Sequence, residues 1–398
     1  MFQRNLVQQL QERMREKRLF IQVIIGPRQT GKTTAVLQAL EALSMPYHFI
    51  SADDPVLANP EWLRNEWERA RLMAKQAIPQ QKQSGRETIL AIDEIQKVSQ
   101  WPSMVKLLWD EDTRRKIPLK VILLGSSSLL IQKGLNESMA GRFEVLFCPH
   151  WSYRECREAF KYSLDDFLFF GGYPGAAALK SDENRWSRYM GSSIVDPVIS
   201  RDVLLMEEIR KPALLRSLFT LGAAYSAQEL SYTKILGQLL DAGNTVTLAH
   251  YLELLGNANI LCGLPKYSAN KLRSRQSSPR FMVYDTSLLT WAAGSSRKRF
   301  FEMPEARGHL VESAVGACLL ARCREEGFSV YWWRDRDKEV DFVIEKGSRV
   351  TAIEVKSGRI KYSGGGLEFK KRFPNALSLT IGSSDLEDFL EGNVQLFK

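Results

Sequence analysis

The feature that most constrains this chain is a run of residues that matches the pattern G-x-x-x-x-G-K-[ST]: Gly26, Pro27, Arg28, Gln29, Thr30, Gly31, Lys32 and Thr33, with Thr34 beside them. The run stands between an apolar stretch and an amphipathic helical stretch, as a phosphate-binding loop requires. Its glycines let backbone N–H groups turn toward phosphate, while Lys32 can reach the β and γ oxygens and the Thr33 hydroxyl can bind Mg²⁺. We therefore expect a site for ATP with Mg²⁺ rather than a chance Gly-rich turn.

Two acidic residues follow a second apolar strand. Residues 89–92 read Ile-Leu-Ala-Ile, and Asp93 and Glu94 come directly after them. We expect Asp93 to hold Mg²⁺ through water, and Glu94 to orient the attacking water as a general base. A strand that ends in two acids is also a common solvated edge. The position downstream of a phosphate-binding loop favours the catalytic interpretation.

Four further polar residues are candidates for the ATP site. Ser126 and Ser127 follow the apolar strand 121–125, where a polar side chain can sense the γ-phosphate, although a simple loop cap is an equal alternative. Arg142 and Arg201 can each donate positive charge to the nucleotide, within the same subunit or in a neighbouring one. Either arginine can equally be a surface residue.

The first 150 residues follow the pattern of an α/β domain. Short β-branched runs alternate with helical stretches, which indicates a parallel sheet wrapped by helices. The expected strands are 20–25, 47–51, 89–92 and 121–125, and the expected helices begin near Lys32, Pro60 and Pro102. The following region, 151–209, is helical and aromatic, and we interpret it as a bridging or lid region.

Residues 210–296 have the outline of a winged helix-turn-helix. Helices are expected at 226–240 and at 247–258, the second capped by Thr245 or Thr247, and two strands follow at 260–267 and 280–284. The stretch 266–280, which includes the loop between those strands, holds five basic residues and no acidic one: Lys266, Lys271, Arg273, Arg275 and Arg280. Such a loop can grip nucleic-acid phosphates, although solvated loops are often basic for no binding reason.

The C-terminal region, 297–398, places four chemical groups in a recognised order. Glu312 lies on an expected helix, 306–324, which three expected strands follow at 330–334, 340–345 and 350–356. Asp341 lies on the second of these strands, and Glu354 and Lys356 lie on the third. Period-two geometry puts Glu354 and Lys356 on one face of their strand. Asp341 and Glu354 can then share divalent metal ions, while Lys356 positions the water that attacks a phosphodiester. This is the PD-(D/E)xK nuclease constellation, and its plain alternative is a hairpin with ordinary exposed charges.

Composition limits the classes of protein that fit. A chain of 398 residues holds about two or three domains. The chain has 55 Lys and Arg residues against 46 Asp and Glu residues, and the resulting net charge of +9 favours a polyanionic partner. The five cysteines form no C-x-x-C pair, and no apolar run approaches the ~18 residues of a membrane helix. The first twenty residues are charged throughout, unlike a secretory signal, so we expect a cytoplasmic protein without a membrane partner.

Taken together, these motifs resemble the prokaryotic AAA-type P-loop ATPases that carry a winged helix and a C-terminal PD-(D/E)xK nuclease-like domain. The resemblance also includes Gly171-Gly172-Tyr173-Pro174 and Asp285. It implies ATP as ligand, Lys32 and Thr33 as its contacts, and a restriction-endonuclease-like α/β fold at the C-terminus. The implied division is an AAA-type ATPase domain, a helical lid, a winged helix and a nuclease-like domain: 1–150, 151–209, 210–296 and 297–398.

The leading functional expectation is an ATP-dependent DNA-processing enzyme, in which ATP hydrolysis is coupled to a metal-dependent nuclease that acts on structured or duplex DNA. One alternative is a non-cleaving ATPase that binds or remodels DNA ends or junctions. Another is a regulatory ATPase switch that binds a protein partner through residues 171–174 and their helical surroundings. Many AAA-type motors form rings in which an arginine of one subunit completes the site of the next, so we also expect a homo-oligomer.

Overall fold

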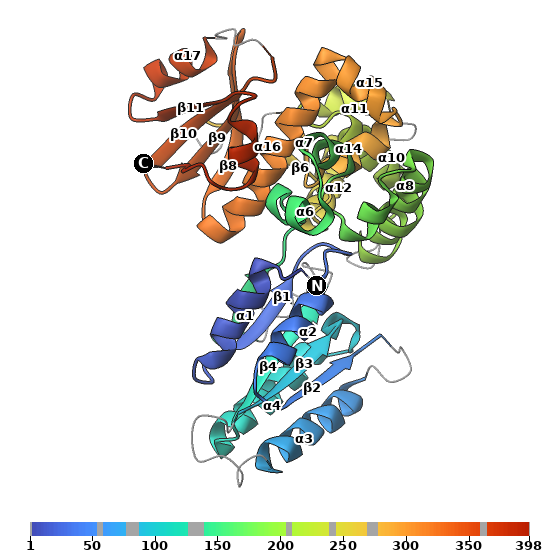
Figure 1. The fold of residues 1–398 in the computed structure, drawn as a ribbon, viewed down its shortest axis with the longest axis vertical. Helices are drawn as coiled ribbons and strands as arrows, with labels where there is room; N and C mark the ends of the chain where they lie inside the picture. Colours follow the sequence, from blue (N-terminus) through green and yellow to red (C-terminus); the bar gives the residue numbers. More distant parts are fainter. Residues whose placement is uncertain are drawn as a thin grey trace. The chain divides into compact units, whose positions relative to one another are not determined.

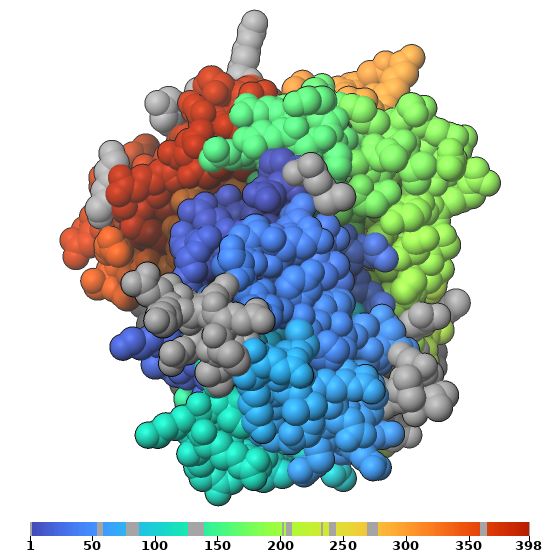
Figure 2. All heavy atoms as spheres, turned by 60° about the horizontal axis from the view of Figure 1, so that its bottom comes forward, coloured from blue at the N-terminus to red at the C-terminus, as the bar shows by residue number. Residues whose placement is uncertain are grey.

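The computed structural model describes residues 2–53, 59–76, 87–125, 139–203, 209–238, 244–268, 278–358 and 364–397. The chain folds into two compact units, Met1–Pro149 and His150–Lys398. Figures 1 and 2 colour unit 1 from blue to blue-green and unit 2 from green to red. Across the described ranges, no helix is both long and apolar enough to cross a membrane.

Unit 1 is built on a parallel sheet of five strands: β1 (Ile21–Ile25), β2 (Tyr47–Ser51), β3 (Thr88–Asp93), β4 (Leu119–Gly125) and β5 (Phe143–Phe147). Their order across the sheet is β2-β3-β4-β1-β5, and every pair is parallel. The four expected strands agree with the structure, and β5 is an additional edge strand. Because β4 lies between β1 and β3, the carboxyl ends of these three strands are neighbours.

Helices cover both faces of this sheet (Figure 1): α1 (Asn5–Arg15), α2 (Lys32–Ala42), α3 (Pro60–Gln76), α4 (Trp101–Arg115) and the short 3-10 turn Ile95–Lys97. The starts of α2 and α3 are as expected, and α4 begins one residue early. All residues of β1, β3 and β4 are buried, which explains why these strands read as continuous apolar runs.

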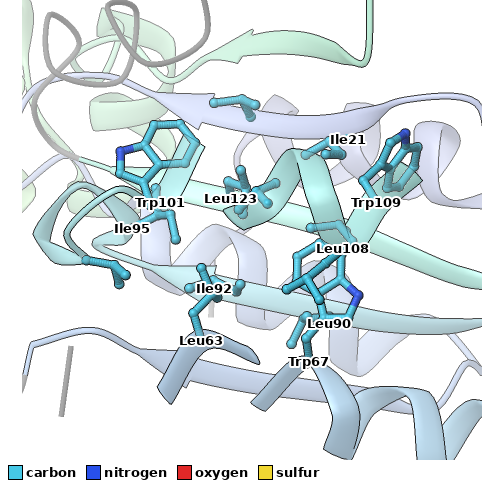
Figure 3. Close-up of a cluster of buried hydrophobic side chains, with 14 of the residues drawn as sticks. Ile21, Leu63, Trp67, Leu90, Ile92, Ile95, Trp101, Leu108, Trp109 and Leu123 are labelled. Atoms are coloured by element: carbon cyan, nitrogen blue, oxygen red, sulfur yellow. The ribbon is translucent and has the colours of Figure 1, made fainter. Parts of the chain in front are cut away.

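Each face of the sheet has its own hydrophobic core. On one face α1 and α2 contribute residues such as Leu10 and Val36 to a cluster that includes Ile24. On the other face Trp67 of α3 and Leu108 of α4 join Leu90 of β3 in a second cluster (Figure 3). The sheet is therefore held rigidly between two packed layers, which fixes the positions of its strand ends.

Unit 2 contains most of the helices of the chain: α6 (Tyr153–Phe160), α7 (Leu164–Phe170), α8 (Glu183–Tyr189), α10 (Pro212–Ala224), α11 (Tyr232–Gln238), α12 (Thr245–Asn257), α14 (Thr286–Ala293), α15 (Arg297–Glu302), α16 (Pro304–Glu326), α17 (Gly365–Arg372) and α18 (Leu386–Leu390). Irregular helical turns occur at Pro174–Leu179, Met190–Val195 and Val198–Val203. The boundaries expected at residues 209 and 296 stay predictions, because unit 2 is one compact body in the structure.

The middle of unit 2 follows the expected order of helices and strands. Helices α10, α11 and α12 precede an antiparallel ribbon of β6 (Leu261–Leu264) and β7 (Arg280–Val283). The expected helix 226–240 is wrong in its first half. Ala227 has a φ of 64°, and its N–H donates to the carbonyl of Phe281 at 2.8 Å, so this segment lies against the ribbon. The cap of α12 is also corrected, because Asn244 accepts from the N–H of Thr247 at 2.9 Å.

The end of unit 2 is a four-stranded sheet: β8 (Ser329–Asp335), β9 (Lys338–Lys346), β10 (Arg349–Val355) and β11 (Leu377–Ile381). Its order is β11-β10-β9-β8, with β11 parallel to β10 and the other pairs antiparallel. The expected helix and three strands are present, while α17, β11 and α18 are additional. The long helix α16 precedes the sheet, and α17 connects β10 to β11.

The Gly171–Pro174 segment packs against Asp285 in the interior of unit 2. Gly171, Gly172 and Tyr173 are buried. The N–H of Gly172 donates to Asp285 Oδ2 at 2.7 Å, and a Cβ on Gly171 would overlap the same carboxylate. Asp285 also caps α14, because it accepts from the N–H of Ser287 at 3.0 Å. Gly171, Gly172 and Tyr173 are therefore not exposed to a partner, and the binding of a protein partner through the surrounding helices stays a prediction.

Candidate nucleotide site and carboxylate cluster

The phosphate-binding loop begins where β1 ends and leads directly into α2. Gln29 and Gly31 both have positive φ values, 61° and 84°, which turn the backbone sharply before the helix. A Cβ on Gly26 would overlap the carbonyl oxygen of Cys148, so only glycine fits at the first position. The sequence therefore produces the expected strand, loop and helix with its glycines at the positions that need them.

The functional side chains of the loop lie within hydrogen-bond distance of one another. Lys32 is buried, and its Nζ donates to the carbonyls of Gly26 at 3.0 Å and Pro27 at 2.6 Å. Thr33 Oγ1 donates to Asp93 Oδ2 at 2.7 Å, which joins α2 to the end of β3. The arrangement brings a cationic amine, a hydroxyl and a carboxylate to one edge of the sheet.

Asp93 and Glu94 occupy the end of β3. Burial raises the pKa of Asp93, against the opposing effect of the Thr33 hydroxyl. Glu94 has a φ of 52°, its N–H donates to Asp93 Oδ1 at 2.9 Å, and its carboxylate accepts from Gln96 Nε2. Gln96 was not predicted from the sequence. It holds the Glu94 side chain, and its position two residues beyond the acidic pair is the only signal that could have identified it.

The side chains of the two predicted serines and of Arg201 are outside the described part of the chain. Ser126 and Ser127 lie outside the described residues, although β4 ends at Gly125, which pairs with Ile25 at the start of the loop. Arg201 lies in the helical turn Val198–Val203, and its side chain is outside the described part of the chain. Their roles at the nucleotide stay predictions.

Arg142 does not reach the nucleotide site of its own subunit. Its guanidinium forms a two-pronged pair with Asp110, at 2.8 and 3.0 Å. The backbone carbonyl of Arg142 accepts from the N–H of Ile21, so Arg142 lies beside the amino end of β1. The phosphate-binding loop follows the carboxyl end of the same strand. Five residues of strand span roughly 16 Å, so Arg142 lies at the opposite edge of the sheet. The prediction of a role within the same subunit is wrong.

In unit 2 the structure brings together the four residues predicted at the C-terminus. Glu354 Oε2 is 3.4 Å from Lys356 Nζ, in agreement with their expected common face. Asp341 Oδ2 accepts from the N–H of Val355 at 2.8 Å, just beyond the last β9–β10 pair. Burial and the neighbouring charge of Asp341 raise the pKa of Glu312 to about 8, an effect that Lys356 partly offsets. We call Glu312, Glu339, Asp341 and Glu354 the carboxylate cluster.

Arg280 lies inside this cluster, which corrects its prediction as a phosphate contact. Its side chain is 7% exposed, and Nη2 lies 2.5 Å from Glu339 Oε1. Nη1 donates to the Asp341 carbonyl at 2.9 Å, and Nη2 is 4.0 Å from Glu312 Oε2. The guanidinium is therefore turned inward and paired with carboxylates, and removing it would leave buried charges without a partner. Lys266 is partly exposed, and Lys271, Arg273 and Arg275 lie outside the described residues.

Three family matches cover most of the chain. Residues 18–157 match the AAA domain family AAA_14. Residues 18–157 form an AAA-type P-loop ATPase domain. The phosphate-binding loop and the acidic pair both lie within this ATPase domain. Residues 161–299 and 307–387 match two domains of unknown function, DUF8612 and DUF4143.

The chain also resembles individual proteins. Uncharacterized proteins of Mycobacterium bovis and Mycobacterium tuberculosis are each 27% identical to it over 335 residues, which is 84% of this chain and 69% of theirs. The Walker-type ATPase of Pyrococcus abyssi aligns with 73% of this chain and 96% of its own, at 14% identity and a TM-score of 0.48. The RuvB Holliday junction branch migration motor of Thermotoga maritima aligns with 65% of this chain and 89% of its own, at 18% identity and a TM-score of 0.32.

The side chains of the ATPase domain fit Mg²⁺. Thr33 and Asp93 supply the hydroxyl and carboxylate oxygens that this ion prefers, and a hydrogen bond of 2.7 Å already brings them together. The raised pKa of Asp93 indicates a buried carboxylate that a cation would stabilise in its charged form. When bound with ATP, Mg²⁺ would neutralise phosphate charge.

The metal site predicted at Asp341 and Glu354 stays a prediction. Within the described ranges, no group of three or more His, Cys, Asp or Glu side chains is arranged to hold a metal ion. Asp341 and Glu354 each accept a hydrogen bond from a backbone N–H, of Val355 and Gly366, through one carboxylate oxygen. Mg²⁺ is usually held by one or two carboxylates together with several waters, so these hydrogen bonds do not decide whether the pair binds it.

Glu312 predicts a pH dependence of stability. Its pKa is about 8 in the folded chain, above the ordinary value of 4.5, so the folded state binds the proton more tightly. Stability from this group is therefore full below about pH 4.5 and is lost as the pH rises through about 8. We expect Glu312→Gln to flatten the fall in unfolding free energy over this range, measured by urea denaturation. The exposed Glu305→Gln on the same helix is the control, and parallel profiles for Glu312→Gln and wild type would contradict the assignment.

Proposed function

We propose that this chain hydrolyses ATP in its AAA domain and couples the hydrolysis to the binding and processing of DNA by unit 2. The observation that carries the ATPase part is the 2.7 Å contact of Thr33 with Asp93, next to Lys32 and Glu94. These residues supply the parts that phosphoryl transfer needs: a loop for the phosphates, a cation, oxygen ligands for Mg²⁺ and a base.

The proposed mechanism assigns one task to each group. The loop amides and Lys32 bind the β and γ oxygens, for which Lys32 must exchange its contacts with the Gly26 and Pro27 carbonyls. Thr33 and Asp93 would hold Mg²⁺, which would neutralise charge on the phosphates. Glu94 orients a water and accepts its proton as the water attacks the γ-phosphate. Gln96 keeps the Glu94 carboxylate in place, and a side chain of Ser126 or Ser127 contacts the γ-phosphate.

The DNA part of the proposal rests on the ribbon of unit 2. Three helices precede β6 and β7, the order of a winged helix-turn-helix, and the connecting loop contains Lys271, Arg273 and Arg275 in addition to Lys266. A net charge of +9 supports a polyanionic partner. We propose structured or duplex DNA, a cytoplasmic location, and a homo-oligomer in which Arg142 or Arg201 completes a neighbouring ATP site.

For the C-terminal sheet, we propose a role in holding DNA rather than cutting it, because the Arg280 guanidinium lies within 4.0 Å of Glu312, Glu339 and Asp341 and places a cation among them. The alternative is cleavage by Glu312, Asp341, Glu354 and Lys356. A labelled panel of single-stranded, duplex, forked and four-way DNA separates the two, because only the nuclease would cut a substrate and stop cutting in Asp341→Ala.

The basic loop gives a quantitative prediction. Replacing Lys271, Arg273 and Arg275 together by Ala should weaken DNA binding and lower the slope of log affinity against log salt by about 3, if each contacts one phosphate. The measurement is fluorescence anisotropy with labelled duplex at several salt concentrations. Lys298→Ala, on an exposed helix face, is the control. An unchanged slope in the triple variant would contradict the assignment of this loop.

A further inference from the structure

We infer that Arg4 is a positioning residue of the ATP site, which fixes the phosphate-binding loop from the side opposite the nucleotide. Arg4 precedes α1, and only 6% of it is exposed. The helix is anchored by Leu6, Val7 and Leu10, which are buried in the core shared with α2. An arginine is costly to bury unless it forms hydrogen bonds, so its partners indicate its purpose.

The partners of Arg4 lie on the loop and on the strand beside it. Nη1 donates to the carbonyl of Thr30 at 3.0 Å and to Cys148 Sγ at 3.0 Å. Nη2 donates to the carbonyl of Pro149 at 3.1 Å. A single planar guanidinium therefore ties the loop to the segment that follows β5. Bonds from a charged donor are stronger than those between neutral groups, and the planar fork fixes their direction.

The bond to Thr30 sets the orientation of the next amide. The carbonyl of Thr30 and the N–H of Gly31 belong to one planar trans peptide, so they point in opposite directions. Arg4 holds the carbonyl on one side, which directs the Gly31 N–H to the other. Gly31 is the N-cap of α2 and has a φ of 84°, a conformation open to more than one peptide orientation. Arg4 removes this freedom at the entrance of the helix that binds phosphate.

Two other contacts show why the loop needs such an anchor. Lys32 holds the carbonyls of Gly26 and Pro27, and these are bonds that it must exchange when it reaches a phosphate. The Thr30 hydroxyl donates to the Pro27 carbonyl at 3.0 Å within the loop, and it lies 3.7 Å from Cys148 Sγ. The contacts of Arg4 reach outside the loop and do not compete with the nucleotide. They therefore persist through the ATP cycle.

The test is nucleotide affinity, and it rests on the proposed ATP binding. With full-length protein and a fluorescent ATP analogue, we expect Arg4→Ala to raise Kd and KM by about tenfold or more, because a bond to a charged donor is lost. We expect Arg4→Lys to recover part of the affinity, since lysine keeps a donor for the Thr30 carbonyl without the fork. Circular dichroism and the thermal midpoint establish that each variant is folded at the assay temperature.

Gln38→Ala is the matched control. Gln38 Nε2 donates to the carbonyl of Phe2 at 3.0 Å, so this variant loosens the same N-terminal segment without touching the loop. Wild-type affinity in folded Arg4→Ala, or an equal loss in Gln38→Ala, would overturn the inference. If Arg4→Ala does not fold, wild-type affinity in Arg4→Lys would overturn it instead. If the wild-type protein does not bind the ATP analogue, the proposed function itself is rejected. This outcome is distinct from a failure of the inference about Arg4, which requires that the wild type binds.

Discussion

Replacing Glu94 by Gln is expected to lower ATP turnover by about 10²- to 10⁴-fold while leaving ATP binding intact, because the loss of a general base has this magnitude. The amide keeps the size of the side chain and can still contact Gln96. Lys32→Ala should instead weaken binding itself, since it removes the cation that reaches the phosphates. The measurements are steady-state phosphate release with Mg²⁺ and the Kd of a fluorescent ATP analogue.

Glu144→Gln provides the matched control for this experiment. It removes a carboxylate from the same ATPase domain, but that side chain accepts from Gln22 Nε2 at 3.2 Å, near the amino end of β1. Turnover close to wild type is expected. If Glu94→Gln retained full turnover, Glu94 would not be the base. An equal loss of turnover in Glu144→Gln would show that the effect is not specific to Glu94.

Removing the guanidinium of Arg280 is expected to have the largest effect on stability. Arg280→Ala leaves Glu339 and Asp341 without the cation that contacts them at 2.5 and 3.8 Å. Breaking a buried ion pair from one side typically costs about 3–5 kcal/mol of unfolding free energy. Urea denaturation of the full-length chain, followed by circular dichroism, measures the loss. Arg280→Lys should recover part of it, because it restores the charge without the fork.

A control variant and an alternative role for Arg280 each predict a result that differs from a large loss of stability. Lys298→Ala breaks only an exposed pair with Glu302, and it should change stability by about 0.5 kcal/mol or less. If Arg280 instead contacted DNA phosphates, as the sequence predicted, Arg280→Ala would weaken DNA binding with little change in stability. That pattern would contradict the inward position of the side chain.

The sequence was sufficient for the ATPase domain because its chemistry depends on neighbouring residues. A phosphate-binding loop needs its glycines, Lys32 and Thr33 in one continuous run, and the buried strands around it read as apolar stretches. The edge strand β5 escaped prediction although four of its five residues are apolar, and its place at the edge of the sheet leaves it only partly buried. Strand β11 also lies at the edge of its sheet, and four of its five residues are not buried.

The sequence failed where function depends on contacts between distant residues. Arg280 is separated by 59 positions from its partner Glu339, and Arg142 by 32 from Asp110. Local composition made both arginines look like free cations, whereas burial next to a carboxylate decides their roles. Arg4 offered no motif at all. Its importance became apparent only when the fold placed it behind Thr30.

The most direct test of the central claim is ATP turnover by the wild-type chain as duplex and four-way DNA are added at low salt, where phosphate contacts are strongest. We predict that turnover rises with DNA and saturates over the same concentration range as binding measured by anisotropy, and that Lys32→Ala abolishes the rise. Turnover that stays constant while the DNA is bound, or a chain that binds no DNA under these conditions, would contradict the coupling of ATP hydrolysis to DNA.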